Sequence, residues 1–186
     1  TIGSIHSFPK RDEGNLSTHH QLMEGTKWIT RMRELSPRNI SPDVLVEKIE
    51  NAFDVRNYLL PNGSSIEDAI EDLKLVLKSI EEEFGNLVFS DFQIDSIYEA
   101  LLNSWSSEPP SKGLIITAET GEGKTLAFDI PAIVDALIEN RMATENQRKP
   151  GLSQLLLYPR NDLAKDQRAT LESYLGRLND NLIDAG

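Results

Sequence analysis

The chain has 186 residues, 39% of them apolar, with 19 basic and 30 acidic side chains and a formal net charge of −11. This length supports one domain of ordinary size, or one domain plus an extension, with a buried core. The absence of cysteine excludes disulfide scaffolds, thiolate zinc sites and cysteine nucleophiles. No apolar run approaches the roughly 20 residues that span a bilayer, and residues 1–30 lack the apolar stretch of a signal peptide. We therefore expect a cytoplasmic protein with no membrane partner.

The negative charge is concentrated in the first part of the chain. Residues 1–110 carry 10 basic and 19 acidic side chains, a net charge of −9, whereas residues 111–186 carry 9 and 11, a net charge of −2. Surfaces that bind nucleic-acid phosphates are normally basic. Any contact with nucleic acid is therefore expected in the second part of the chain, and the acidic first part suits solvent or a protein partner.

The first part divides into residues 1–18, which predict an irregular arm rich in glycine and small polar residues, and residues 19–86, which predict a helical extension. Ser41-Pro42 is a good helix start, because serine caps free N–H groups and proline has none to satisfy. Ser65 with Asp68 resembles a capping box. The next helix has an apolar stripe at helical spacing: Ile66, Ile70, Leu73, Leu77, Ile80 and Phe84. Opposite this stripe lie acidic residues that predict a solvated face: Glu67, Asp68, Glu71, Asp72 and Glu81 to Glu83.

Residues 87–186 have a different pattern. A helix is predicted over residues 90–105, and the apolar, β-branched run 113–118 is typical of a buried parallel strand. A second buried strand is predicted over residues 154–158, and a helix follows each strand, the last over about residues 162–178. Strands that alternate with helices at this spacing predict βαβ units. We therefore expect an α/β fold, a parallel sheet flanked by helices, preceded by the helical extension.

Ala118-Glu119-Thr120-Gly121-Glu122-Gly123-Lys124-Thr125 carries the strongest chemical signal, since it follows a predicted strand and precedes a predicted helix. Successive backbone N–H groups of residues 120–125 can surround a phosphate at the helix N-terminus. The two glycines permit unusual backbone angles and a close approach of the ligand. We expect the Lys124 ammonium to bind the β- and γ-phosphates and the Thr125 hydroxyl to ligate Mg²⁺.

A chance turn between a strand and a helix is the alternative for these eight residues. Ala118 stands where the general phosphate-loop pattern has its first glycine. A match of this quality arises by accident in about one chain per hundred. The context of strand and helix makes the phosphate site the favoured interpretation.

Residues 118–125 resemble motif I of the superfamily 2 helicases, in which alanine is usual at the first position, and residues 126–131 are similar to its continuation. Residues 158–167 resemble motif Ia, and the ending Leu163-Ala164-Lys165-Asp166-Gln167 resembles the YprA/Lhr-type branch more than standard DEAD-box proteins. The resemblance implies that residues 87–186 are the first part of a RecA-like ATP-binding domain. It also implies ATP and Mg²⁺ as cofactors and single-stranded DNA or RNA as the partner.

The resemblance gives roles to further residues, each with an alternative. Gln93 lies about where the family has its adenine-reading glutamine, but it also follows Ser90 by three residues and equally well completes a helix capping box. Arg160 and Asn161 would donate to a nucleic-acid phosphate, or they are simply part of a polar strand-to-helix turn. Glu122 replaces the family's common small residue, and its carboxylate should weaken triphosphate binding unless it points to solvent or meets a cation.

The site predicted from the sequence is thus defined residue by residue. The catalytic residues would be Lys124 and Thr125, with Thr125 also the metal ligand, and Arg160 and Asn161 would bind nucleic acid. The cofactor-binding residues would be Gln93, Thr120, Gly121, Glu122, Gly123, Lys124 and Thr125.

These motifs imply the N-terminal part of an ATP-dependent helicase or translocase, by resemblance to a branch that includes DNA-repair and anti-phage helicases. Two alternatives from other classes stay open. One is a P-loop phosphotransfer or switch enzyme, in which residues 158–167 are only a turn. The other is a non-catalytic module whose acidic helices bind a partner protein.

The motif order predicts a motor domain that is cut off part-way. After residue 167 the sequence has no Asp-Glu pair that follows an apolar strand, the pair that would hold Mg²⁺ and activate water. Such groups contribute several orders of magnitude in rate. We expect the isolated chain to hydrolyse ATP negligibly, as measured by phosphate release, and a rate well above background would contradict this expectation.

Overall fold

The computed structural model describes residues 36–53, 58, 60, 63–106, 113–118, 121–141, 154–158 and 160–185. All of them belong to one structural unit, residues 35–186. The predicted irregular arm over residues 1–18 lies outside the described residues. So do residues 19–35 of the predicted helical extension and Glu119 and Thr120 of the predicted phosphate loop.

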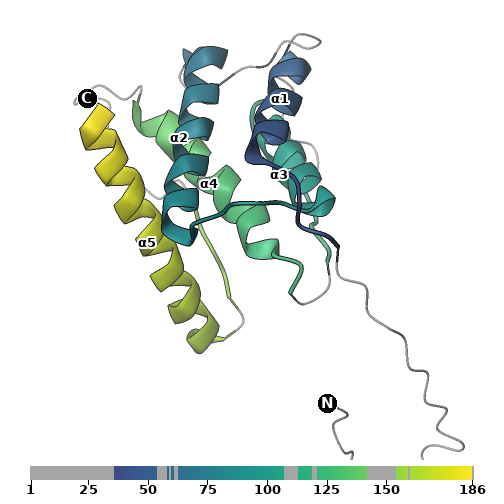
Figure 1. Cartoon of the computed structure of the whole chain (residues 1–186), viewed down its shortest axis with the longest axis vertical. Helices are drawn as coiled ribbons and strands as arrows, with labels where there is room; N and C mark the ends of the chain where they lie inside the picture. The colour runs from purple at the N-terminus through teal and green to yellow at the C-terminus, as the bar shows by residue number, and fades with distance from the viewer. Residues whose placement is uncertain are drawn as a thin grey trace, which may run out of the picture. The chain divides into compact units, whose positions relative to one another are not determined.

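Five helices make up most of the described residues (Figure 1). They are α1 (Pro42–Phe53), α2 (Ile66–Phe84), α3 (Asp91–Ser104), α4 (Lys124–Arg141) and α5 (Asn161–Ala185). All five fall where the hydrophobic periodicity predicts helices, although α5 is longer than expected from the sequence. None of the helices within the described ranges combines the length and apolar character needed to cross a membrane.

The helix ends follow from local side-chain chemistry. At the start of α2, Ser65 Oγ accepts from the Asp68 backbone N–H at 3.0 Å, and the Asp68 carboxylate accepts from the Ser65 backbone N–H at 3.3 Å. The same reciprocal arrangement joins Ser90 and Gln93 at the start of α3. Helix α2 stops at Gly85, whose φ of +90° suits glycine and whose N–H donates to Glu81. The predicted capping box at Ser65 is confirmed.

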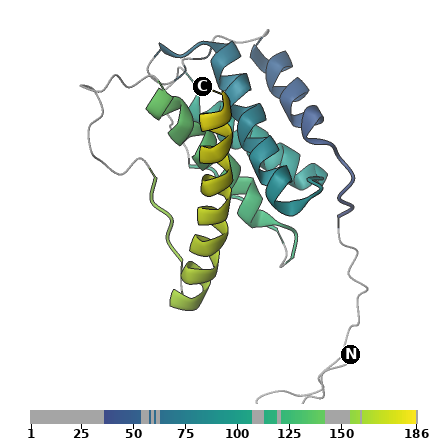
Figure 2. The same cartoon turned by 60° about the vertical axis from the view of Figure 1, so that its left-hand side comes forward.

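Helix α4 is packed on two sides, against α2 and α3, while α1 contacts α2 and α3. Helix α5 runs alongside α2 in both views, and its N-terminal half extends past the end of α2 (Figure 1, Figure 2). One core joins residues of the predicted helical extension to residues of the second part of the chain. Its largest fully buried side chains include Trp105, Phe89, Leu45, Leu73, Ile97 and Ile130. Burial of each such side chain stabilises the fold by about 1.5–3 kcal/mol.

The apolar stripe of α2 is buried in its middle. Ile70, Leu73, Leu77 and Ile80 belong to the core, whereas Ile66 and Phe84, at the two ends of the helix, are exposed. The acidic face is also as expected for most of its residues, which are exposed. Asp72 is the exception, because it is fully buried rather than solvated. Because α2 contacts α1, α4 and α5, part of its polar side is buried together with its apolar side.

The predicted parallel sheet is wrong for the described residues. No strand occurs among them, and their only β pairings are two isolated bridges, Ile40 with Phe89 and Tyr58 with Ser106. Residues 113–118 and 154–158 are extended but unpaired. Most of their apolar side chains are exposed, to 85% at Ile115 and 82% at Leu157. The described fold is therefore helical, and the α/β, RecA-like class expected from the sequence is corrected accordingly.

The physical reason is that a strand depends on hydrogen bonds to another segment, whereas a helix satisfies its own backbone. An apolar, β-branched run indicates that a segment would be stable in a sheet. Whether it forms a strand depends on a second segment that can pair with it. Within the part of the chain that the structure describes, neither segment has such a neighbour, so both stay single.

Asp129 on α4 is a buried carboxylic acid. Its side chain is 2% exposed, and its Oδ1 has no hydrogen-bond partner within the described residues. Burial raises the pKa of Asp129 from 3.8 to about 6, because the charged form loses its hydration. Burial and, next, the charge of Asp129 also raise the pKa of Tyr158 and of Tyr174. These two tyrosines, from the extended segment before α5 and from α5 itself, therefore lie close to Asp129.

This acid should make stability depend on pH. Because the folded pKa is raised, the contribution of Asp129 to stability is fully present below pH 3.8 and is lost as the pH rises through about 6. The variant Asp129→Asn should therefore raise the free energy of unfolding at pH 7.5 by about 1–2 kcal/mol, with the unpaired amide offsetting part of the gain. The difference from the parent chain should vanish near pH 4, as followed by urea unfolding.

The matched control is Asp180→Asn, which changes an exposed carboxylate on α5. It should leave the stability nearly unchanged at both pH values. An Asp129→Asn variant that shows the same stability difference at pH 4 and pH 7.5 would contradict the argument from burial.

Candidate nucleotide-binding site

The glycine loop, defined as residues 118–125, joins the extended residues 113–118 to the start of α4. Gly121 and Gly123 have φ angles of +91° and +79°, which residues with a side chain rarely adopt. The first turn of α4, which is described in full, contains no acidic residue. The free N–H groups of this turn and the positive end of the helix dipole can therefore bind an anion without repulsion from a carboxylate in the turn itself.

Lys124 and Thr125 occupy the first two positions of α4, and both are half-buried. The Lys124 Nζ donates across the loop to the carbonyl oxygen of Ala118. Thr125 lines a cavity of about 410 Å³ that lies between α4, α5 and the segment after α2. Other residues that line it are Arg38, Val88, Gln167, Thr170 and Tyr174. This volume lies in the range of small-molecule sites.

Gln93 is fully buried and uses both ends of its side-chain amide. Its Oε1 accepts from the Ser90 N–H at 3.1 Å, which completes the capping box of α3. Its Nε2 donates to the carbonyl oxygen of Gly123 at 3.1 Å. The capping alternative for Gln93 is therefore present in the structure, and the same side chain ties the N-terminus of α3 to the glycine loop.

Arg38 also belongs to this site, although no sequence pattern singles it out. Its Nη2 donates to the carbonyl oxygen of Gly121 at 2.8 Å, from a position 83 residues earlier in the chain. A Cβ built on Gly123 would lie 2.5 Å from Gln93 Nε2 and 2.9 Å from Arg38 Nη2. Both side chains therefore lie against the same part of the loop. No motif surrounds Arg38, so only the tertiary structure reveals it.

Glu122 lies between the two glycines and is half-buried. It therefore does not point freely into solvent, which was one of the two conditions under which its carboxylate would leave triphosphate binding unaffected. Its charge remains a factor that opposes an anion in the loop.

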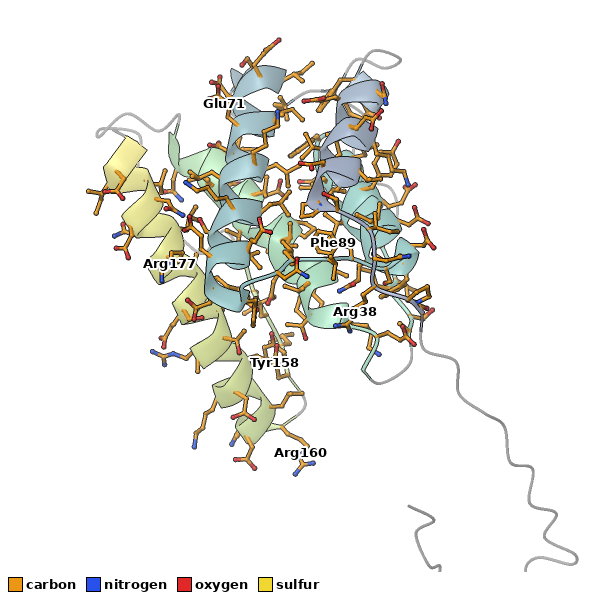
Figure 3. All side chains as sticks on the ribbon, in the orientation of Figure 1. Arg38, Glu71, Phe89, Tyr158, Arg160 and Arg177 are labelled. Carbon is orange, nitrogen blue, oxygen red and sulfur yellow. The ribbon has the colours of Figure 1, made fainter. Side chains whose placement is uncertain are left out.

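Arg160 and Asn161 lie at the N-terminal end of α5, and both are exposed. Figure 3 shows the Arg160 side chain pointing away from the neighbouring helices. The backbone carbonyl of Arg160 accepts from the Ala164 N–H at 3.0 Å, which starts the helix. The two side chains thus stand beside the free N–H groups of a 25-residue helix.

The structure brings some of the predicted residues together. Gln93 meets the glycine loop directly, and Thr125 shares a cavity with Gln167, which belongs to the segment that resembles motif Ia. The Gln167 Oε1 is buried with no hydrogen-bond partner in the described part of the chain. The cavity therefore connects the loop to α5, although Arg160 and Asn161 do not line it.

Comparison with known proteins adds independent observations. The family model of the DEAD/DEAH box helicase matches residues 91–185. The ATP-dependent RNA helicase dbp9 of Schizosaccharomyces pombe is 34% identical over 106 residues, which are 50% of this chain and 17% of that protein. The Druantia protein DruE of Escherichia coli is 37% identical over 75 residues, 40% of this chain and 4% of that protein. The mitochondrial ATP-dependent RNA helicase MSS116 of Meyerozyma guilliermondii is 33% identical over 112 residues, 53% of this chain and 15% of that protein.

No solved structure matches the chain significantly. The chain spans less than a fifth of the length of each of these three relatives. The family match covers about half of the chain, and it includes Gln93, the glycine loop and α5. This chain belongs to the DEAD/DEAH box helicase family.

Proposed function

We propose that this chain supplies the ATP-binding loop of an ATP-dependent nucleic-acid helicase or translocase. The observation that carries the proposal is the glycine loop at the start of α4, where two glycines take positive φ angles and their carbonyl oxygens accept bonds from outside the loop. This loop lies inside the region that matches the helicase family.

The groups gathered at the loop fit a magnesium triphosphate. The start of α4 offers free N–H donors, Lys124 an ammonium group and Thr125 a hydroxyl. Lys124 would leave the Ala118 carbonyl for the β- and γ-phosphates, because a bond between opposite charges is stronger than one to a neutral carbonyl. Thr125 would ligate Mg²⁺, and the bound metal would supply positive charge shared by those phosphates.

The hydrogen bonds that Gln93 already makes limit its ability to bind adenine. Its Oε1 and one N–H are already used, by Ser90 and by Gly123. The amide has a second N–H, which adenine would have to reach at a fully buried side chain. We therefore propose that Gln93 holds the loop in place and that any contact with adenine requires a shift of this side chain.

The proposed nucleic-acid contact lies at the start of α5. The N-terminal half of α5 is largely exposed, and Arg160 and Asn161 offer donors beside its free N–H groups. Such donors bind the phosphate backbone and carry no sequence information. We propose single-stranded DNA or RNA as the partner. A place in the YprA/Lhr-type branch, in repair or anti-phage defence, is supported by residues 163–167 and by the similarity to DruE.

The acidic face of α2 is proposed as a surface for a protein partner, in a cytoplasmic protein. Glu67, Glu71 and Glu81 to Glu83 are exposed, and Glu71 points outward from α2 in Figure 3. Their charge disfavours contact with a phosphate backbone. This face is therefore proposed for a protein partner rather than for the nucleic acid.

Lys124 should contribute strongly to nucleotide binding. Lys124→Ala should weaken the binding of a fluorescent ATP analogue with Mg²⁺ by about 10- to 100-fold, because it removes a charge-assisted contact to phosphate. The fold should persist, as seen by circular dichroism, since Lys124 is only half-buried. The control Lys78→Ala changes an exposed lysine of α2 that pairs with Glu82, and it should bind normally. Unchanged affinity in Lys124→Ala would contradict the phosphate site.

Arg160 should contribute to the binding of single-stranded nucleic acid. Arg160→Ala in the full-length protein should weaken the binding of single-stranded oligonucleotides of any sequence and reduce the slope of log affinity against log salt by about 1. Arg177→Ala is the matched control, because Arg177 is an exposed arginine of the same helix (Figure 3). The two lie about 25 Å apart along the helix, beyond the reach of screened charge interactions.

The ATPase rate of the full-length protein, measured with and without oligonucleotides, distinguishes a helicase from a phosphotransfer or switch enzyme. Single-stranded RNA or DNA should raise the ATPase rate of the full-length protein, and Arg160→Ala should reduce that stimulation. An ATPase rate that ignores both oligonucleotides would favour the switch enzyme instead.

A further inference from the structure

Arg38, in the segment before α1, contacts the glycine loop. Arg38 Nη2 donates to the carbonyl oxygen of Gly121 at 2.8 Å. Arg38 lies outside the region that matches the helicase family, residues 91–185. Its contact with the loop is therefore a feature of this chain that the family match does not account for.

The backbone around Arg38 is held in place. The Asn39 and Ile40 N–H groups donate to the Phe89 carbonyl at 3.1 and 3.0 Å, and the Phe89 N–H donates back to Ile40 at 2.8 Å. Phe89 is fully buried in the core. Figure 3 labels Arg38 and Phe89 on these two adjoining segments. A buried anchor one to two residues away restricts where the Arg38 side chain can reach.

The carbonyl groups that Arg38 and Gln93 bind, those of Gly121 and Gly123, are each followed in the chain by an N–H group that can bind an anion. A peptide bond is planar and trans, so the carbonyl of one residue points opposite to the N–H of the next. With the Gly121 carbonyl turned toward Arg38, the Glu122 N–H points away from Arg38. With the Gly123 carbonyl turned toward Gln93, the Lys124 N–H points away from Gln93.

We propose that Arg38 is a positioning residue for the phosphate-binding loop, acting together with Gln93. The two side chains fix the planes of two peptide bonds, so that the Glu122 and Lys124 N–H groups face the same anion before it binds. Fixing donors in advance removes the cost of ordering them when the ligand arrives. This inference rests on the proposed nucleotide site. It adds that the segment preceding α1 takes part in forming that site.

The Arg38 contact and the binding of phosphate should each strengthen the other. If Arg38 favours the loop conformation that binds phosphate, then a bound phosphate favours the Arg38 contact by the same factor. The segment from Ser36 to Ile40 should therefore become more ordered when nucleotide binds.

The test uses the whole chain, Mg²⁺-ADP as the ligand and adenosine as the phosphate-free comparison. Arg38→Ala should weaken ADP binding by about three- to tenfold, the size expected for one exposed hydrogen bond to a charged donor. Adenosine binding should not change, because adenosine does not use the Glu122 and Lys124 amides. Arg38→Lys, which keeps the positive charge and N–H donors but not the planar guanidinium, should recover part of the ADP affinity.

Two measurements report on the loop itself. The backbone amide resonances of Glu122 and Lys124 should shift in Arg38→Ala without ligand, while those of α1 and α2 stay in place. ADP should slow hydrogen exchange at Asn39 and Ile40 in the parent chain, and less so in Arg38→Ala. Asn39→Ala is the matched control, since it changes the next side chain and keeps the backbone bonds to Phe89.

Gly123→Ala should also displace the Arg38 and Gln93 side chains from the glycine loop. Its Cβ would meet both Gln93 Nε2 and Arg38 Nη2 at less than 3 Å, so it should weaken ADP binding more than Arg38→Ala does. Adding Arg38→Ala to Gly123→Ala should then cost little more, because the contact is already lost.

The outcomes separate this inference from the proposed function. A parent chain that binds neither ADP nor ATP would overturn the nucleotide site itself. A parent chain that binds ADP, with Arg38→Ala binding it equally well, would overturn only the role of Arg38. Equal losses for ADP and adenosine in Arg38→Ala would show a general structural effect and would also overturn it.

Discussion

Helix α4 is packed against α2 and α3, and the glycine loop is attached to its first residue, so the position of the loop depends on how α4 is buried. Ala127, Ile130, Val134 and Ile138 of α4 are almost fully enclosed. Their burial is worth several kcal/mol in total, which is enough to hold the N-terminus of the helix in one place. The loop conformation is then a question of how its few peptide bonds are oriented.

Those peptide bonds are oriented from outside the loop. Gln93 at the start of α3 and Arg38 before α1 each hold one glycine carbonyl. Gln93 does so while it completes the cap of its own helix. One buried amide therefore serves helix stability and loop geometry together, and a change at Gln93 should disturb both. Arg38 adds a contact from the part of the chain that the family match does not include.

Exposed apolar side chains and a buried carboxylic acid, Asp129, mark the part of the described fold where burial and polarity match least well. Ile115 and Leu157 lie on single extended segments with most of their surface in solvent. Asp129 is enclosed beside Tyr158 and Tyr174 at a cost in solvation. All of these residues belong to the glycine-loop side of the sequence, after residue 112. In α2 and α3, by contrast, the N-terminal caps are satisfied and most apolar side chains are buried, although Asp72 of α2 is a buried carboxylate as well.

The helices were accessible from the sequence because their signals are local. The caps at Ser65 and Ser90 and the stripe along α2 depend on residues three or four positions apart, and the structure has these helices in the expected places. The glycine loop was also recognisable, since its chemistry lies in eight consecutive residues. Its predicted roles in ATP and Mg²⁺ binding, like those of Arg160 and Asn161, stay predictions.

The sheet and the contacts of the site were not accessible in the same way. Strand pairing needs a second segment, and the β-branched runs at residues 113–118 and 154–158 could not report that none is paired with them among the described residues. The burial of Asp72 and Asp129 depends on which helices surround them. The sequence by itself determined the helices and the phosphate-type loop, through interactions between near neighbours. Only the tertiary structure decided that Arg38, 83 residues from Gly121, and Gln93 hold that loop, because long-range contacts leave no periodic trace in the chain.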